Sequence, residues 1–151
     1  MTQGKYFEEL EIGDVFTSPG RTITETDIIL FAGLSGDYNE LHTSVEFAKA
    51  TPFGQRIAHG LLGLSIASGL GSRAGFIEGT AIAFTGLEWK FKAPVFIGDT
   101  IYLQAQVEKK RMMKALGGGM VILDIQLINQ EEKTVQQGTW KVIIKSEPTE
   151  E

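Results

Sequence analysis

The sequence predicts an α+β domain in which one buried helix precedes an antiparallel sheet. The segment 60–71, GLLGLSIASGLG, places apolar residues on all sides of a helix, with only Gly and Ser between them. A helix that is apolar all round is a buried one. From Thr80 onward, apolar and polar residues alternate, which is typical of strands with one buried and one wetter face. The simplest packing curls the sheet around the helix.

Two shorter helices are expected before the buried one. The segment 24–36, TETDIILFAGLSG, begins with Thr24 as N-cap and has Asp27 three residues later, which is a weak capping box. Gly36 can end this helix. The segment 44–51, SVEFAKAT, predicts a second short helix, which the following proline ends.

Glycines interrupt the buried helix. Gly63 and Gly69 each cost about 1 kcal/mol relative to Ala in a helix interior. They indicate that backbone, sheet or ligand comes very close there. Together with Gly71, they either leave space for a ligand or permit tight packing against the sheet.

The sheet is expected to contain at least four long strands. The alternating segments are 86–92, 101–110, 121–130 and 139–146. Such a sheet leaves an edge that is either covered or paired with another chain, so we expect a homodimer, with a higher oligomer also compatible. We expect one domain over residues 1–146 and a disordered tail over 147–151, which has nothing apolar to bury.

Composition narrows the classes of function. The net charge of −5 argues against a protein that binds nucleic acid. The chain has no cysteine, which removes disulfides, thiolate metal sites and thiol nucleophiles together. No signal peptide is visible at the N-terminus, and the longest apolar stretch is too short to span a membrane. We therefore expect a cytoplasmic protein with neither nucleic acid nor membrane as a partner.

Three polar residues with catalytic potential gather within a short segment. Asp37, Asn39 and His42 follow the first predicted helix, in a loop that can turn all three toward one cleft. A carboxylate and an imidazole can share one water and move protons to and from it. Alternatively, Asp37 and Asn39 only form turns and a helix cap, as short polar side chains commonly do.

The start of the buried helix offers a second element. If this helix begins near Gly60, the free N–H groups of its first turn can hold a carbonyl oxygen that becomes an enolate. Alternatively, His59 and Gly60 form an ordinary helix start. The wide spacing of the two histidines matches no compact set of metal ligands, so we expect no metal. No phosphate-binding loop or dinucleotide motif is present, and we expect no cofactor.

The segments FAGLSGDYNELH (31–42), FAKATPFGQRIAHGLL (47–62) and WKFKAPVFIGD (89–99) resemble the MaoC-like dehydratases, specifically the (R)-specific enoyl-CoA hydratases. The resemblance covers almost the whole chain. It implies the hot-dog fold, in which a curved antiparallel sheet wraps a long central helix, usually in a dimer. It also implies syn hydration of a trans-2-enoyl-CoA to the (3R)-3-hydroxyacyl-CoA, and the reverse dehydration, without a metal or redox cofactor. The carrier is either CoA or acyl carrier protein.

The resemblance assigns roles to the site residues. Asp37 and His42 correspond to the catalytic pair that binds the attacking water, and Asn39 to a supporting polar residue. Gly60 corresponds to the backbone donor to the thioester oxygen. We expect His42 to be the base and Asp37 the water holder and proton donor, although the two roles can be exchanged in a coupled pair.

Two further residues, His59 and Ser68, are expected to contact the substrate, with Ser68 facing the acyl pocket. One departure from the family pattern is Glu40, which stands where proline is common. Because every catalytic group remains in place, we expect this change to affect substrate preference and loop rigidity more than activity. Two alternatives remain: an acyl-CoA thioesterase on the same fold, and an acyl-CoA-binding module without catalysis.

Overall fold

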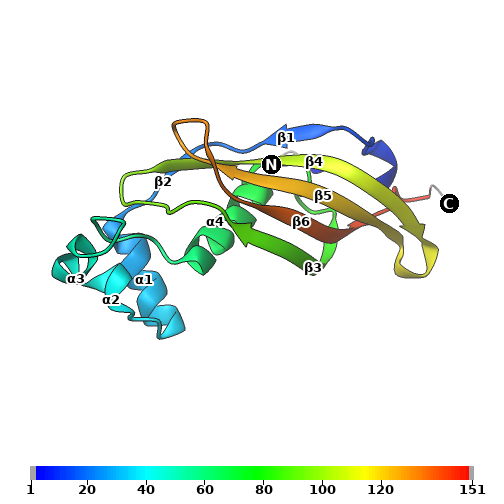
Figure 1. The fold of residues 1–151 in the computed structure, drawn as a ribbon. Helices are drawn as coiled ribbons and strands as arrows, with labels where there is room; N and C mark the ends of the chain where they lie inside the picture. Colours follow the sequence, from blue (N-terminus) through cyan, green and yellow to red (C-terminus); the bar gives the residue numbers. More distant parts are fainter. Residues whose placement is uncertain (1–2, 150–151) are drawn as a thin grey trace.

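The computed structural model describes residues 3–149 and confirms the α+β class (Figure 1). The helices are α1 (Glu25–Ser35), α2 (Glu40–Thr43), α3 (Val45–Lys49) and α4 (Gly60–Arg73). The strands are β1 (Val15–Thr17), β2 (Arg21–Thr22), β3 (Ala81–Phe91), β4 (Thr100–Met113), β5 (Gly118–Ile128) and β6 (Thr134–Lys145). They form an antiparallel sheet in the order β1-β4-β5-β6-β3, with β2 paired to β4 beside that path. The sheet curves over α4, while α1 to α3 gather at one end of it (Figure 1).

Most predicted elements are present. The four segments predicted as strands are β3 to β6, and the two predicted short helices are α1 and α3. β3 begins at Ala81, earlier than predicted. The structure adds β1, β2 and α2, of which α2 replaces part of the expected loop with one helical turn. Each addition is four residues long or shorter, so its periodicity is too brief to be detected in the sequence.

The core lies between α4 and the concave face of the sheet. Its fully buried strand residues include Ile101, Leu103, Ala105 and Val107 in β4 and Val121, Leu123, Ile125 and Leu127 in β5, as the alternation predicted. From α4 the core receives Leu62, Ile66, Ala67 and Leu70. Full burial of one such Leu, Ile or Val side chain contributes about 1.5–3 kcal/mol. The apolar pattern therefore fixes which face of each strand meets the helix.

Burial of α4 is one-sided in the single chain, which corrects the expectation of burial all round. The side away from the sheet carries Leu61, which is 59% exposed, and the exposed Ser65 and Ser68. Small residues and one leucine on this side are compatible with a second layer, but the described part of this chain supplies none.

The glycines of α4 permit tight packing against the sheet. A side chain at Gly63 would overlap the carboxamide of Gln136, and one at Gly71 would lie 3.0 Å from the Trp140 ring. A Cβ at Gly69 would meet nothing within 4 Å. Two of the three glycines are therefore explained by sheet side chains that occupy the space, and not by a ligand.

The C-terminal segment continues past β6 without regular structure over residues 146–149. The Glu147 N–H donates a 2.9 Å hydrogen bond to the Glu8 carboxylate, so part of the predicted tail contacts the domain. Residues 150 and 151 lie outside the described residues, and disorder of the tail stays a prediction. Across residues 3–149, no helix has both the length and the apolar character needed to cross a bilayer.

The predicted capping box at the start of α1 is present in full. The Asp27 N–H donates to the Thr24 hydroxyl at 3.3 Å, and the Thr24 N–H donates to the Asp27 carboxylate at 2.9 Å. Partial burial alone would raise the pKa of Asp27. The Thr24 N–H, the Thr24 hydroxyl and the Arg21 guanidinium, 2.7 Å away, outweigh burial and lower that pKa below its ordinary value of 3.8.

We expect Asp27→Ala to lower the free energy of unfolding by about 1 kcal/mol at pH 7, because it removes the cap acceptor and the Arg21 partner. A carboxyl group whose pKa is lowered by folding stabilises the protein above its unfolded pKa and loses that contribution as pH falls through its folded pKa. The difference between native and variant should therefore shrink below about pH 4. Urea unfolding of both proteins at several pH values measures this difference in the free energy of unfolding.

Thr26→Ala is the matched control for this prediction, since Thr26 lies in the same turn and is exposed. It should change the unfolding free energy little at any pH. A deficit of Asp27→Ala that stays constant from pH 7 into acid would contradict the assignment to an ionised cap.

Candidate active site

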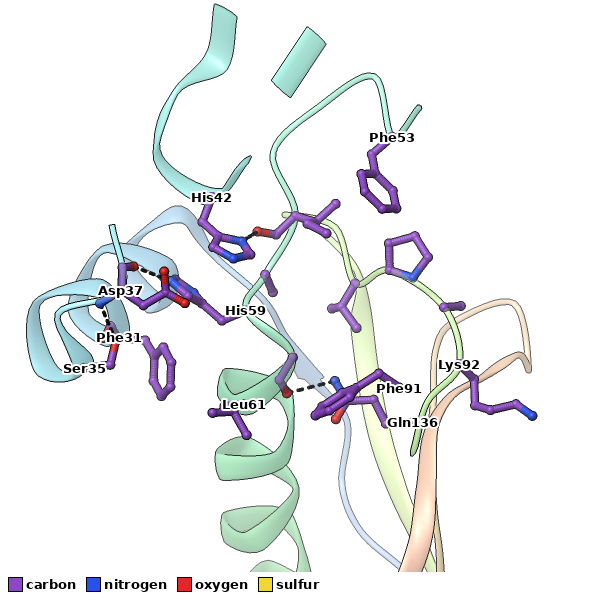
Figure 2. A pocket seen from close by; sticks show the side chains of 16 residues that line it. Phe31, Ser35, Asp37, His42, Phe53, His59, Leu61, Phe91, Lys92 and Gln136 are labelled. Carbon is purple, nitrogen blue, oxygen red and sulfur yellow. Dashed lines mark hydrogen bonds between the residues drawn. The ribbon is translucent and has the colours of Figure 1, made fainter. Parts of the chain in front are cut away.

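A cavity of about 550 Å³ opens at the N-terminal end of α4 (Figure 2). Its walls come from the α1–α2 loop, the turn before α4, and the segment 91–95, which begins with the last residue of β3. Apolar walls include Phe31, Phe53, Leu61 and Phe91. Ser35, Asp37, His42 and His59 lie on one side, where the α1–α2 loop meets the helix start, and Lys92 and Gln136 lie on the other (Figure 2).

Asp37 contributes its carboxylate from the turn that follows α1. α1 ends at Gly36, whose φ of 77° favours glycine and whose N–H bonds the Ala32 oxygen at 2.9 Å. The Asp37 N–H donates to the Ser35 hydroxyl, and one carboxylate oxygen accepts the Asn39 N–H, each at 3.1 Å. This turn holds the carboxylate beside the cavity and leaves its other oxygen free to bind there.

His42 lies in α2 and is 9% exposed. Its Nδ1 is 2.8 Å from the backbone oxygen of Ile57. A carbonyl oxygen only accepts hydrogen bonds, so Nδ1 must carry the proton. In the neutral ring, Nε2 therefore has a free lone pair, which is the form that a general base requires.

His59 joins the Asp37 turn to the start of α4. It is 3% exposed, and its Nε2 donates to the backbone oxygen of Asp37 at 2.9 Å. Its ring stacks on that of His42, with centroids 3.9 Å apart and 28° between the planes. Its Nδ1 is buried and has no partner among residues 3–149. His59 thus fixes backbone and ring positions, and its predicted contact with substrate stays a prediction.

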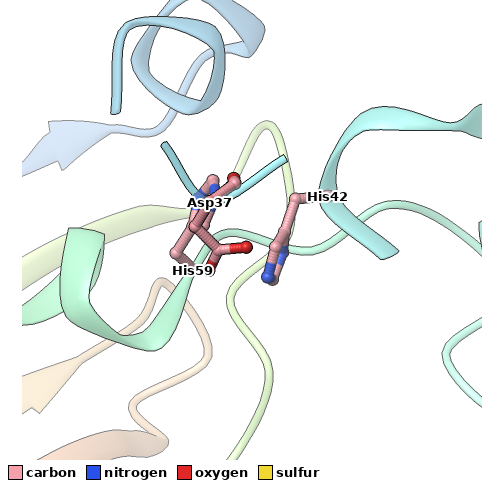
Figure 3. A group of neighbouring side chains, drawn as sticks. All are labelled: Asp37, His42 and His59. Atoms are coloured by element: carbon pink, nitrogen blue, oxygen red, sulfur yellow. The ribbon is translucent and has the colours of Figure 1, made fainter. Parts of the chain in front are cut away.

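The Asp37, His42 and His59 side chains form one group, with a ligand-type atom of each within 4.8 Å of the others (Figure 3). Two of the four imidazole nitrogens carry protons toward carbonyl oxygens. The fold thus brings together two histidines whose wide spacing in the sequence argued against a metal site, and the absence of a metal stays a prediction. The Asp37 carboxylate turns toward the His42 ring (Figure 3), an arrangement suited to a shared water.

Gly60 begins α4 directly beside this group. The first N–H groups of a helix have no partner within the helix, and they carry the positive end of its dipole. Gly60 also lines the cavity, and a side chain there would lie 2.8 Å from the Phe91 ring. The site therefore has a backbone donor at one wall and a carboxylate–imidazole pair at another.

Asn39 and Ser68 lie outside the cavity wall. Asn39 caps α2, because its side-chain oxygen accepts the Leu41 N–H at 3.1 Å, and so it supports the helix that carries His42. Ser68 is exposed on α4 and its hydroxyl donates to the Ser65 oxygen at 2.7 Å. A role for Ser68 in the acyl pocket stays a prediction.

Sequence reasoning missed three polar residues of the cavity, Ser35, Lys92 and Gln136, of which only Gln136 of β6 is buried. Gln136 shares the two-residue period of Trp140 and Val142, which are buried on the inward face of the same strand. A polar side chain on the inward face of a strand was therefore the available signal, but it preceded the predicted segment.

Comparison with known proteins agrees with this geometry. The model of the MaoC like domain matches residues 8–123. An (R)-specific enoyl-CoA hydratase from Rhodospirillum rubrum is 44% identical over 97 residues, which cover 64% of this chain and 65% of that protein. The match thus spans slightly less than two thirds of that relative's length. A 3-hydroxybutyryl-CoA dehydratase from Methylorubrum extorquens is 37% identical over 128 residues, 79% of each chain.

Solved structures extend the similarity to the whole fold. A MaoC-like dehydratase from Rhodospirillum rubrum superimposes with a TM-score of 0.87 and 26% identity, over 97% of this chain and 100% of that one. A protein from Mycobacterium tuberculosis with a double hotdog fold gives a TM-score of 0.84 at 21% identity, over 98% of this chain and 46% of that one. The expected hot-dog fold is confirmed, and the chain belongs to the MaoC-like dehydratase family.

Proposed function

We propose that this protein is an (R)-specific enoyl-CoA hydratase, which also catalyses the reverse dehydration of a 3-hydroxyacyl-CoA. One observation carries the proposal: the Asp37 carboxylate and the free Nε2 of His42 converge at a cavity whose wall is the N-terminus of α4. The names of the hydratase and dehydratase relatives support the same reaction. Hydration leaves the overall oxidation level unchanged, so it requires acid–base groups and an oxyanion donor rather than a redox cofactor.

The mechanism follows from the positions of these groups. The thioester oxygen accepts the Gly60 N–H, which polarises the enoyl group and stabilises the negative charge that develops during attack. Water held between Asp37 and His42 attacks C3, and its O–H bond breaks as the proton moves to Nε2 of His42. A proton from the same pair then forms the new C2–H bond. The sum is one water added, with OH on C3 and H on C2.

The stereochemistry follows from the single acid–base pair. Because Asp37 and His42 both lie on one side of the cavity, the new C–O and C–H bonds form on the same face of the double bond. This is syn addition. The 3R hand of the product is proposed by analogy with the hydratase relative.

Activity should depend on both members of the pair. We expect the native protein to remove the conjugated enoyl absorbance of crotonyl-CoA and to form the 3R product. Asp37→Asn and His42→Ala should each lower kcat by about 10²–10⁴-fold, the usual contribution of a positioned acid or base. Absorbance kinetics and chiral analysis of the product measure both effects.

Asp124→Asn provides the matched control, since Asp124 lies on β5 away from the cavity and should leave kcat unchanged. Release of free CoA in place of hydration would overturn the proposal in favour of a thioesterase. Binding of crotonyl-CoA without turnover would favour an acyl-CoA-binding module.

We further propose that the protein is a homodimer joined along β3. Within the described residues, β3 pairs only with β6, and its other edge is open. Its exposed apolar side chains are Ile82, Phe84, Leu87 and Phe91, which are 40–54% exposed. An open edge with exposed apolar side chains is a template for pairing with another strand. The half-exposed α4 lies under the same strand and extends the apolar surface (Figure 1).

The combined change Ile82→Lys and Leu87→Lys should convert a dimer into monomers, because it would bring four lysines, two from each copy, to the new sheet junction. Light scattering after gel filtration should give twice the chain mass for the native protein and a single chain mass for the variant. Ile12→Lys, at an exposed site before β1, is the control and should stay dimeric. A monomeric native protein would contradict the proposal.

Both CoA and acyl carrier protein present the acyl group as the same thioester, so the proposed chemistry applies to either. The cytoplasmic location expected from the sequence stays a prediction.

A further inference from the structure

Two hydrogen bonds in series join the sheet to the first turn of α4 at the base of the cavity. The Trp89 indole N–H donates to the Gln136 side-chain oxygen at 2.9 Å, and the Gln136 amide nitrogen donates to the backbone oxygen of Gly60 at 3.1 Å. Trp89 lies in β3 and Gln136 in β6, so two strands are connected to the helix. Figure 2 shows Gln136 behind the Phe91 ring, with its bond to the helix start.

These partners leave the carboxamide of Gln136 only one orientation. An indole N–H only donates and a carbonyl oxygen only accepts, so the Gln136 oxygen must face Trp89 and the nitrogen must face Gly60. A flipped amide would place donor against donor and acceptor against acceptor. Gln136 is 3% exposed, so water cannot easily replace either bond.

The helix is shaped to receive this side chain. A side chain at Gly63 would overlap the Gln136 carboxamide, and one at Gly60 would collide with the Phe91 ring that covers it. Both glycines therefore permit the amide to reach the helix backbone. The contact therefore depends on the glycines of α4 as well as on Gln136 of β6.

The start of α4 lacks the usual local restraints. In the described chain, its N-cap residue His59 makes no side-chain cap bond, and the first turn contains no acidic residue. The His59 ring is committed to the backbone oxygen of Asp37. Gly60 itself has the widest backbone freedom of any residue. Contacts from outside the helix therefore add to the backbone bonds of the first turn in setting the direction of its peptide groups.

We infer that Gln136, oriented by Trp89, is a positioning residue that sets the Gly60 N–H for the substrate oxygen. This inference rests on the hydratase function proposed above. Gln136 holds the carbonyl of the Gly60–Leu61 peptide, which adjoins the peptide that carries the Gly60 N–H, and it does not contact the reacting atoms. A misplacement of about 1 Å in a catalytic site costs about 10²-fold in rate, and loss of a whole oxyanion donor costs about 10²–10³-fold.

The test compares kcat and KM for crotonyl-CoA in Gln136→Met, Trp89→Phe and the double variant. Met keeps the length of Gln but makes neither hydrogen bond. We expect Gln136→Met to lower kcat by about tenfold or more, with KM within about twofold, because the donor matters most when charge develops on the oxygen. Trp89→Phe should have a smaller effect. In the double variant it should add nothing, because Trp89 acts through Gln136.

Gln137→Met is the matched control. Gln137 is the next residue of β6, on the opposite face, where it borders a separate polar hollow on the outer side of the sheet. The same chemical change there should leave kcat and KM at native values. If Gln137→Met lost as much kcat as Gln136→Met, the loss would reflect a general disturbance of β6 rather than the hydrogen bond to Gly60. That result would overturn the inference.

A second measurement does not depend on turnover. The Gly63 N–H bonds the His59 oxygen at 3.2 Å in the first turn of α4. In Gln136→Met we expect the Gly63 N–H to exchange with solvent faster and the NMR chemical shift of the Gly60 amide to change. Neither change is expected in Gln137→Met. Native kcat together with native exchange in a folded Gln136→Met would overturn the inference. If the native protein hydrates no enoyl thioester, the proposed function fails, and exchange alone decides whether Gln136 positions this turn.

Discussion

The close approach of α4 to the concave face of the sheet is the constraint on which the rest of the structure depends. Protein interiors are packed as densely as organic crystals, so two surfaces can meet this closely only where one lacks side chains. Gly63 and Gly71 supply those gaps, and Gln136 and Trp140 fill them. The helix is thereby fixed in height over the sheet. Its free N-terminus falls where the α1–α2 loop and the segment 91–95 can enclose it.

Backbone carbonyl groups, rather than other charged side chains, organise the polar end of this cavity. The Ile57 oxygen selects the ring nitrogen of His42 that carries the proton, and the Asp37 oxygen does the same for His59. A carbonyl cannot change its role as acceptor, so both ring orientations are set without an additional ionised group. His59, which precedes α4, therefore contacts the loop that carries the carboxylate through its hydrogen bond and contacts α2 through the stacked His42 ring. The packing of α4 against the sheet therefore also determines the positions of Asp37 and His42.

Local features of this protein were readable from sequence, and distant ones were not. The capping box of α1 and the alternation of β4 depend on neighbours a few residues apart, and both are present. Asn39 was read as a site residue or a cap, and it caps α2. By contrast, Gln136 lies 76 residues from Gly60 in the chain, and no short pattern connects them. Only the folded sheet shows that an inward glutamine meets a helix start.

The packing of α4 also limits where an acyl chain can lie. Because sheet side chains occupy the spaces at Gly63 and Gly71, a chain cannot pass between helix and sheet at those positions. The cavity meets α4 only at Gly60 and Leu61, and the same side of the helix further along, at Ser68, is exposed in the single chain. An apolar acyl chain gains nothing from lying against water. An acyl chain can therefore lie along this side of α4 only where a second layer, such as the second copy of the proposed dimer, covers it.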